Sequence, residues 1–309
     1  MATIKVTMIQ YLYFGRVGYD EGLRLQAEIA EWRLQGRVEN VLLLLEHPPV
    51  LTLGRNADRT NVLASEELLA RRGVTVHEIN RGGDVTYHGP GQLVGYPIFD
   101  LRSLCNTNGG RMGPVDFVRL MEEALIRLCC GFGVRAGRLA GLTGVWCGSF
   151  ADGESADSNA DSENGNAARG SKVSAGPERK IGAIGIHVAR GITSHGFAFN
   201  VTTDLRDFDL IVPCGIPDHP VTSLERELSE PKNVPTLEAV AHQAAREFGL
   251  VFDQQVLAVE SLAAFRAQVR PAIGAPEFPA PEFPAEDTPL QVPTEVERLK
   301  HKQDHPIQA

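Results

Sequence analysis

The sequence predicts an α/β (α+β) fold, in which helices flank a mixed β-sheet, and its first fifty residues already indicate this. Residues 4–13 alternate apolar and polar side chains as a strand does, and residues 20–35 repeat apolar side chains at roughly helical spacing. Residues 40–46 contain a continuous apolar run, which is typical of a strand buried on both faces. The chain therefore begins as β-α-β, and strands and helices mix through the rest of it.

The later elements follow from capping residues and chain breaks. Ser65 is a typical N-cap residue and predicts a short helix that runs to Arg72, with a strand over 74–79 after it. Residues 114–130 are predicted to form a helix that stops at Gly131. The remaining elements are three β-rich segments, 181–187, 192–200 and 201–203, and a helix over 236–248 that is opened by Pro235 and Thr236.

Composition divides the chain into one domain, residues 1–255, and a C-terminal extension, residues 256–309. Within the domain, residues 151–178 are dominated by small and polar side chains and include no aromatic residue, which predicts a disordered surface insertion. From residue 271 the extension is rich in Pro and Glu and contains the pentapeptide Ala-Pro-Glu-Phe-Pro twice. This composition suits a disordered, extended polyproline II tail.

Charge and cysteine usage exclude several classes of function. The formal net charge of −9 argues against binding of nucleic acid or anionic membranes, because both need clustered Lys and Arg. The first ten residues predict neither a signal peptide nor a membrane span, so we expect a cytoplasmic protein. The five cysteines form no Cys-x-x-Cys pair, and free thiols in a reducing compartment are expected, with no metal and no cofactor.

The densest unusual segment is the glycine-rich stretch 81–92, directly after a predicted strand. Its four glycines allow backbone to approach a ligand closely, and Arg81, Tyr87 and His88 can present polar groups there. The segment lacks both the Gly-x-Gly-x-x-Gly pattern and the Lys-Ser/Thr ending of phosphate-binding loops. On its own it is compatible with a binding loop or with a tight turn.

A second candidate is Lys180, which stands next to alternating glycine and apolar residues on a predicted strand. A strand that buries Ile181 and Ile184 places the ammonium near an apolar wall, and burial lowers the pKa of a lysine and suits it to proton transfer. The spacing alone favours the alternative, a surface lysine whose ammonium snorkels to water.

The third candidate is Cys214, which sits between Pro213 and Gly215 on a predicted turn. Proline fixes the approach of the chain and glycine clears space beside the sulfur, so the thiol is compatible with a nucleophile and equally with a buried structural residue. A free thiol has a pKa of about 8.5, and an ammonium nearby favours the reactive thiolate. The other four cysteines stand at helix-end, loop and strand positions that predict inert thiols: Cys105, Cys129, Cys130 and Cys147.

At these three segments the chain resembles the octanoyltransferase, or lipoyl(octanoyl) transferase, family of lipoate biosynthesis, whose relatives are the biotin and lipoate protein ligases. The resemblance covers roughly residues 5–255, and its motifs follow the family order: 81–92, Thr143-Gly144-Val145-Trp146, 179–185, 195–200 and 212–216. It implies a biotin/lipoate protein ligase-like catalytic domain. It also implies transfer of an octanoyl group from octanoyl-acyl carrier protein to a lysine of E2 subunits or glycine-cleavage H protein, by a monomeric enzyme.

The resemblance also implies roles for individual residues. Cys214 matches the residue that carries the acyl thioester, and Lys180 matches the residue that lowers the pKa of the cysteine and shuttles protons. His47 matches a motif whose histidine lies near the pocket. Three segments match those that line the acyl pocket: Arg81, Gly82, Gly83, Asp84, Val85, Thr86, Tyr87 and His88; Ala183, Ile184 and Gly185; and Gly196, Phe197 and Ala198.

Two departures from the family pattern qualify this reading. The insertion before Lys180 is much longer than in most relatives, which could alter the loop that leads to the lysine. Asp84 stands where many relatives carry Gln, which would add a carboxylate near the substrate and weaken binding. Two alternatives remain: an ATP-dependent lipoate or biotin ligase, against which Cys214 argues, and a non-catalytic acyl-binding or scaffold protein, which the presence of both Lys180 and Cys214 disfavours.

Overall fold

The computed structural model describes residues 8–106, 109–148, 177–216, 218–230 and 233–271. These residues belong to one compact unit that ends at Pro271. The segment 256–271, which the sequence analysis assigned to the C-terminal extension, is therefore part of this unit. The predicted insertion, apart from residues 177 and 178, and the predicted tail beyond residue 271 lie outside the described residues.

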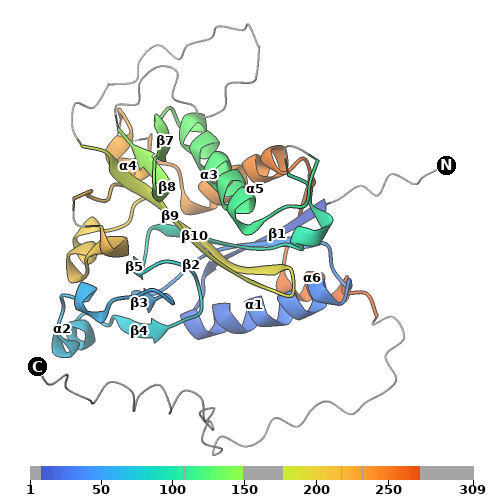
Figure 1. Cartoon of the computed structure of the whole chain (residues 1–309), viewed down its shortest axis with the longest axis horizontal. Coiled ribbons are helices and arrows are strands. Elements are labelled where there is room, and N and C mark those ends of the chain that lie inside the picture. Colours follow the sequence, from blue (N-terminus) through green and yellow to red (C-terminus); the bar gives the residue numbers. More distant parts are fainter. Residues whose placement is uncertain (1–7, 107–108, 149–176, 217, 231–232, 272–309) are drawn as a thin grey trace, which may run out of the picture. The chain divides into compact units, whose positions relative to one another are not determined.

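The core of the unit is an eight-stranded mixed sheet (Figure 1). β1 pairs in parallel with β2 and β11, and every other neighbouring pair in the sheet is antiparallel. The strands, in spatial order, are β11 (Gln255–Ala258), β1 (Met8–Arg16), β2 (Asn40–Glu46), β6 (Gln92–Ile98), β10 (Ile192–Asn200), β9 (Arg179–Ala189), β8 (Leu142–Cys147) and β7 (Ala136–Leu139).

Helices cover both faces of this sheet (Figure 1). α3 (Pro114–Gly131) and α5 (Leu237–Val251) pack on one face, and α1 (Tyr19–Leu34) and α6 (Leu262–Ala267) on the other. β2 shows why both faces need cover, because its side chains alternate between the two hydrophobic cores. Leu42 and Leu44 pack in the core beneath α3 and α5, whereas Val41, Leu43 and Leu45 pack in the core beneath α1.

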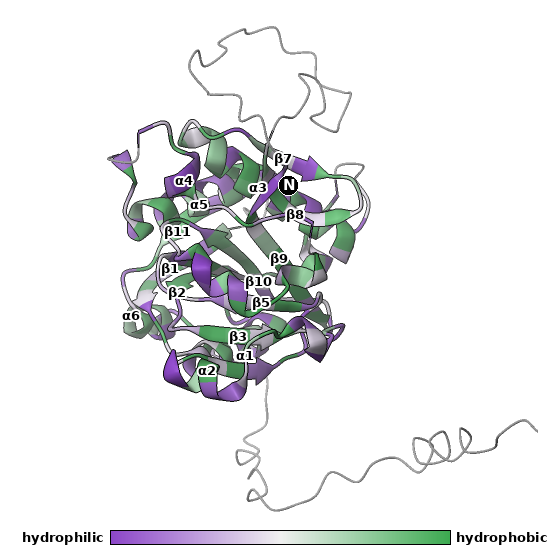
Figure 2. Cartoon of the chain, turned by 90° about the vertical axis from the view of Figure 1, so that its left-hand side faces the viewer, coloured by the Kyte–Doolittle hydropathy of each residue, from purple (hydrophilic) through white to green (hydrophobic). Residues whose placement is uncertain are grey.

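A smaller three-stranded sheet forms the rest of the unit, with the order β4 (Thr75–Glu78), β3 (Val50–Leu53) and β5 (Val85–His88). The helix α2 (Glu66–Arg71) packs its Leu69 into the small core of this sheet. Hydrophobic residues dominate β3, which is mostly green in Figure 2. The remaining elements are α4 (Leu224–Glu227) and the 3-10 turns Arg59–Asn61, Leu101–Ser103, Leu205–Leu210 and Pro213–Gly215.

The predicted fold class is confirmed, and the element boundaries mostly lie close to those predicted. Both predicted N-caps form, since the Ser65 hydroxyl accepts a hydrogen bond from the Leu68 N–H and the Thr236 hydroxyl accepts one from Ala239. The prediction of β-structure over 201–203 is wrong. These residues form a bend, because the N–H groups of Val201 and Thr202 both donate to the carbonyl of Gly91 instead of to a neighbouring strand.

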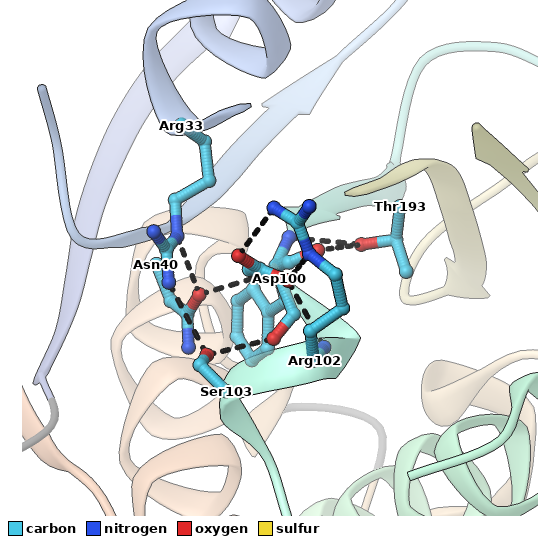
Figure 3. Close-up of polar contacts among 7 residues, drawn as sticks. Arg33, Asn40, Asp100, Arg102, Ser103 and Thr193 are labelled. Atoms are coloured by element: carbon cyan, nitrogen blue, oxygen red, sulfur yellow. Dashed lines mark hydrogen bonds and ion pairs between the residues drawn. The ribbon is translucent and has the colours of Figure 1, made fainter. Parts of the chain in front are cut away.

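A partly buried polar network ties α1, β2, β10 and the turn after β6 together (Figure 3). The carboxylate of Asp100 accepts two hydrogen bonds of 2.8 Å from the Arg102 guanidinium. The Asn40 amide oxygen accepts from the N–H of Asp100 at 3.1 Å and from the Arg33 side chain at 2.9 Å. We call this set the Asp100 cluster: Arg33, Asn40, Asp100, Arg102, Ser103 and Thr193.

The Asp100 cluster keeps its carboxylate charged. Burial alone would raise the pKa of Asp100, but the hydrogen bonds and charge of Arg102, with the charge of Arg33, outweigh it and leave that pKa lowered.

None of the helices in the described part of the chain has the length and hydrophobicity needed to cross a membrane.

Candidate active site

A cavity of about 290 Å³ lies where β9 and β10 of the large sheet meet β5 of the small one. Its volume is close to the lower end of the range for small-molecule sites. The side chains that border it are mostly apolar or aromatic, with few charged groups among them. The lining residues are Tyr19, Ile79, Arg81, Gly83, Asp84, Thr86, His88, Val94, Tyr96, Gly141, Leu142, Thr143, Lys180, Ala183, Ile184, Gly185, His195, Gly196, Phe197, Ala198, Cys214 and Ile216.

Lys180 borders this cavity from the start of β9. The residue is only 7% exposed, so the sequence-based alternative of a snorkelling surface lysine is wrong. Its ammonium lies over the ring of Trp146 on β8, 4.8 Å from the ring centroid. Among the described residues no carboxylate pairs with this ammonium, and the aromatic face is the contact that stabilises its charge.

Cys214 borders the same cavity from the turn Pro213–Gly215. Its backbone is in the left-handed region, with φ of 57°, which is uncommon for a residue with a side chain and costs about 1 kcal/mol or more. Gly215 also has a positive φ, and a Cβ there would lie 2.6 Å from the Asp84 carboxylate. The turn is therefore shaped around the sulfur, which is partly exposed.

Two backbone clamps hold the Cys214 turn at the cavity that Lys180 borders, one to Lys180 and one to Asn61, although these residues are far apart in the sequence. After the turn, the Lys180 N–H donates to the Pro220 carbonyl and the Thr222 N–H donates to the Lys180 carbonyl, each at 2.9 Å. Before the turn, the Val212 N–H donates to the Asn61 carbonyl at 2.7 Å. The cysteine and the lysine also border a second, smaller void next to the cavity.

Asp84 braces this turn. Its carboxylate accepts hydrogen bonds from the Asn61 amide and from the Val85 N–H, both at 2.6 Å, and from the Asp58 N–H at 3.1 Å. These three donors of the protein engage both carboxylate oxygens, and the expectation that this carboxylate weakens substrate binding stays a prediction.

Arg81 supplies a second buried cation. The Thr52 hydroxyl and carbonyl and the Gly82 carbonyl accept from its guanidinium, so the described hydrogen bonds of Arg81 all go to neutral acceptors. Burial lowers the pKa of Arg81, while the negative charges of a Cys214 thiolate, Tyr19 and Asp84 act in the opposite direction. Arg81 stays charged, since a guanidinium does not deprotonate in proteins, and it lines the same cavity as Cys214.

Three histidines near the cavity are held neutral. Burial lowers the pKa of His195 to about 4 and that of His88 to about 3. His88 donates from Nδ1 to the Gln92 side-chain oxygen at 2.8 Å, and Gln92 donates to Asn200 at 2.9 Å. Neutral histidines leave Arg81 and Lys180 as the cations that line the cavity.

His47, the third histidine, lies behind the cavity wall. Its Nδ1 is 2.7 Å from the Val17 carbonyl, so Nδ1 must donate, and the neutral ring then accepts the Tyr96 hydroxyl at Nε2 over 2.7 Å. Burial lowers the pKa of His47 to about 4. His47 thus orients Tyr96, and Tyr96 is the residue that borders the cavity.

The structure places most, but not all, of the residues predicted from the sequence at the cavity. Gly82, Val85 and Tyr87 do not border it, because Val85 and Tyr87 point into the core of the small sheet and the Tyr87 hydroxyl donates to Asp207. The remaining predicted residues, apart from His47, all line the cavity: Arg81, Gly83, Asp84, Thr86, His88, Lys180, Ala183, Ile184, Gly185, Gly196, Phe197, Ala198 and Cys214.

The predicted site did not include several lining residues, notably Tyr19 and Tyr96, and His195 stood in the matching segment 195–200 without being assigned to the pocket. Tyr96 could have been found, because Val94 and Tyr96 alternate on β6 and point to the same side as each other. Tyr19 begins α1 and gives no local signal. Cys105, Cys129, Cys130 and Cys147 do not line the cavity, and the described residues contain no group of three metal-binding side chains.

Comparison with known proteins places this geometry in context. The model of the lipoyl protein ligase A/B catalytic domain matches residues 18–249. The octanoyltransferase of Acidobacterium capsulatum is 58% identical over 82% of this chain and 94% of its own, and that of Koribacter versatilis is 48% identical over 82% and 88%. One similar solved structure is a bipartite lipoate protein ligase from Thermoplasma acidophilum, from a structural study of that ligase and its E2 lipoyl domain. It has a TM-score of 0.57 at 14% identity, and the match covers 85% of this chain and 91% of that one. A lipoate-protein ligase A bound with ATP has a TM-score of 0.53 at 15% identity, covering 84% and 92%. These two structures have the same fold.

Proposed function

Because the chain belongs to the octanoyltransferase family and is an acyltransferase of protein lipoylation, we propose that Cys214 carries the octanoyl group as a thioester. The donor is octanoyl-acyl carrier protein, and the acceptor is a lysine amine of a lipoyl-dependent protein. One observation supports this most strongly: Lys180 and Cys214, far apart in the sequence, border one mostly apolar cavity.

The first step is attack of the Cys214 sulfur on the carbonyl carbon of the donor thioester. A new carbon–sulfur bond forms at Cys214, the bond to the carrier sulfur breaks, and the proton lost by Cys214 passes through Lys180 to the carrier thiolate. One thioester replaces another, so no nucleotide is required. The apolar wall formed by Ala183, Ile184 and Phe197 holds the acyl chain.

The second step is attack of the acceptor lysine amine on the Cys214 thioester. An amide bond forms, the carbon–sulfur bond breaks, and the proton released by the amine returns to the cysteine through Lys180. Arg81, the second cation that lines the cavity, favours the negative charge that develops on the sulfur as the proton leaves it in the first step and as the carbon–sulfur bond breaks in the second. Because an amide is more stable than a thioester, this step runs downhill.

We assign the acceptors by chemistry and by kinship. The T. acidophilum ligase that shares this fold was studied with its E2 lipoyl domain, and we extend this partner class to the present chain as E2 subunits and glycine-cleavage H protein. We further propose that the enzyme works as a monomer in the cytoplasm, where free thiols such as Cys214 persist in the reduced state.

The test is intact-protein mass spectrometry after incubation of the full chain with octanoyl-acyl carrier protein. We expect a mass increase of one octanoyl group that is removed by hydroxylamine and absent from Cys214→Ser. Lys180→Ala should acylate about 10³-fold more slowly, the size of effect that general acid–base groups have. Free octanoate with ATP serves as a second donor, and acylation from that mixture alone would establish a ligase instead.

A further inference from the structure

Glu122 is a fully buried carboxylate outside the cavity, on α3. Its side chain has no exposed surface. One oxygen accepts from Arg119 at 2.7 Å and from Arg138 at 3.2 Å, and the other accepts from the backbone N–H of Gly144 at 2.9 Å. A buried carboxylate destabilises a protein unless it is fully hydrogen-bonded. In Glu122, one of the two oxygens accepts from a single backbone N–H of β8.

Gly144 is the part of β8 that lies against the Lys180 side chain. A Cβ on Gly144 would lie 2.7 Å from Cε of Lys180 and 2.6 Å from the Gly182 carbonyl, and its φ is +129°. The pairing of β8 with β9 shifts register just after this point, between Val145 and Trp146. The Lys180 side chain therefore passes over an irregular piece of backbone. Only glycine fits at position 144, because any Cβ there would clash with Lys180 and with the Gly182 carbonyl.

We infer that Glu122 is a positioning residue for Lys180, acting through Gly144. The carboxylate fixes the Gly144 backbone, that backbone forms the wall along the lysine chain, and the wall directs the ammonium over Trp146 and toward the cavity. This inference rests on the proposed role of Lys180. It adds a side chain that touches neither the substrate nor the reacting sulfur.

The neighbouring Glu123 provides a matched control. It also lies on α3 and also pairs with Arg138, at 3.0 Å, and with Arg127, at 2.8 Å, but no described hydrogen bond joins it to Gly144. Loss of a carboxylate on this helix, and of its arginine pairing, is common to both positions. Of the two residues, only Glu122 has a described hydrogen bond to the backbone beside Lys180, at Gly144.

The experiment compares single-turnover acylation of Cys214 by octanoyl-acyl carrier protein in Glu122→Ala, Glu122→Gln and Glu123→Ala. We expect Glu122→Ala to slow acylation about tenfold to a hundredfold, since small displacements of reacting groups have effects of this size. Glu122→Gln should recover most of the rate because its amide oxygen can still accept from Gly144. Glu123→Ala should remain within about twofold of wild type.

Coupling to Lys180 separates positioning from general damage. In the Lys180→Ala background, Glu122→Ala should cause no further loss, whereas damage to the whole site would give additive losses. Additive losses, or equal losses in Glu122→Ala and Glu123→Ala, would overturn the inference. If Glu122→Ala does not fold, Glu122→Met replaces it, because methionine fills the space but cannot accept from the Gly144 N–H, and a wild-type rate in that variant would contradict the inference. If Lys180→Ala itself acylates at the wild-type rate, the proposed function fails, which is a distinct result.

Discussion

The Asp100 cluster and the cavity both gather polar side chains beside the same sheet, but their charged groups have opposite surroundings. In the Asp100 cluster the arginine and the carboxylate face each other in a two-bond pair. At the cavity, Lys180 meets an aromatic ring and Arg81 meets neutral oxygens. Pairing removes reactivity and adds stability, so the first arrangement holds the fold and the second is available for chemistry.

The cavity and the Asp100 cluster also differ in backbone conformation. Cys214 and His195 both have positive φ, in the left-handed region that is uncommon for residues with side chains. No residue of the Asp100 cluster has a positive φ. Strain of this kind persists only where the surroundings hold it, and here the two clamps of the Cys214 turn do so.

The largest expected effect tests the Asp100 cluster. Asp100→Ala removes the cap of a 3-10 turn and leaves Arg102 without its partner, and it should lower the free energy of unfolding by about 2–3 kcal/mol while activity stays within about twofold. Asp204 is the matched control, because it caps another 3-10 turn and pairs with Arg206 at the same spacing, but on the surface. Urea unfolding should show a much smaller loss for Asp204→Ala, and equal losses would break the comparison.

The next effect concerns the neutral histidines of the cavity. The pKa of His47 is about 4 in the folded protein and about 6.5 when unfolded, so between these values the unfolded state binds more protons. The stability from neutral His47 is thus complete above pH 6.5 and is lost as the pH falls toward 4. When the pH falls from 7 to 5, the free energy of unfolding should decrease by on the order of 2 kcal/mol less in His47→Gln than in wild type. Identical losses in urea titrations would show that His47 is not held neutral.

The smallest expected effect concerns strain at the nucleophile. Cys214→Gly relieves the left-handed backbone, although glycine also gains freedom in the unfolded chain, and the net gain in stability should be about 0.5 kcal/mol. Cys214→Ala keeps the strain and should show no such gain. Both variants lose the thiol and therefore acyl transfer. A Cys214→Gly variant less stable than Cys214→Ala in thermal or urea unfolding would show that the turn is relaxed.

The sequence predicted the regular parts of the fold because local signals determine them. The apolar run of β2, the Ser65 and Thr236 caps and the Pro114 helix each depend on neighbours in the chain. The bend at 201–203 and the inclusion of β11 and α6 in the folded unit depend on partners far away, Gly91 for the first and β1 for β11. No periodicity within those segments encodes such pairing.

The candidate site was predicted as three separate segments. Their spacing in the sequence does not predict that the three segments line one cavity. Motif resemblance identified Lys180 and Cys214, but the burial of Lys180 over Trp146 contradicts the expectation from its local pattern. Tyr19 and Glu122 lie on helices whose patterns predict only core packing and surface charge. Their relation to the site exists only in three dimensions, where a helix start and a buried carboxylate approach strands distant in sequence.

The two clamps on the Cys214 turn have a consequence for how the enzyme matures. The lysine strand, the residues around Asn61 and the chain from 211 to 222 must all be in place before the sulfur has its cationic neighbours. Closing loops of such length costs chain entropy before any of these contacts forms. A partly unfolded chain therefore lacks the cavity beside this sulfur, and acyl transfer through Cys214 requires the folded enzyme.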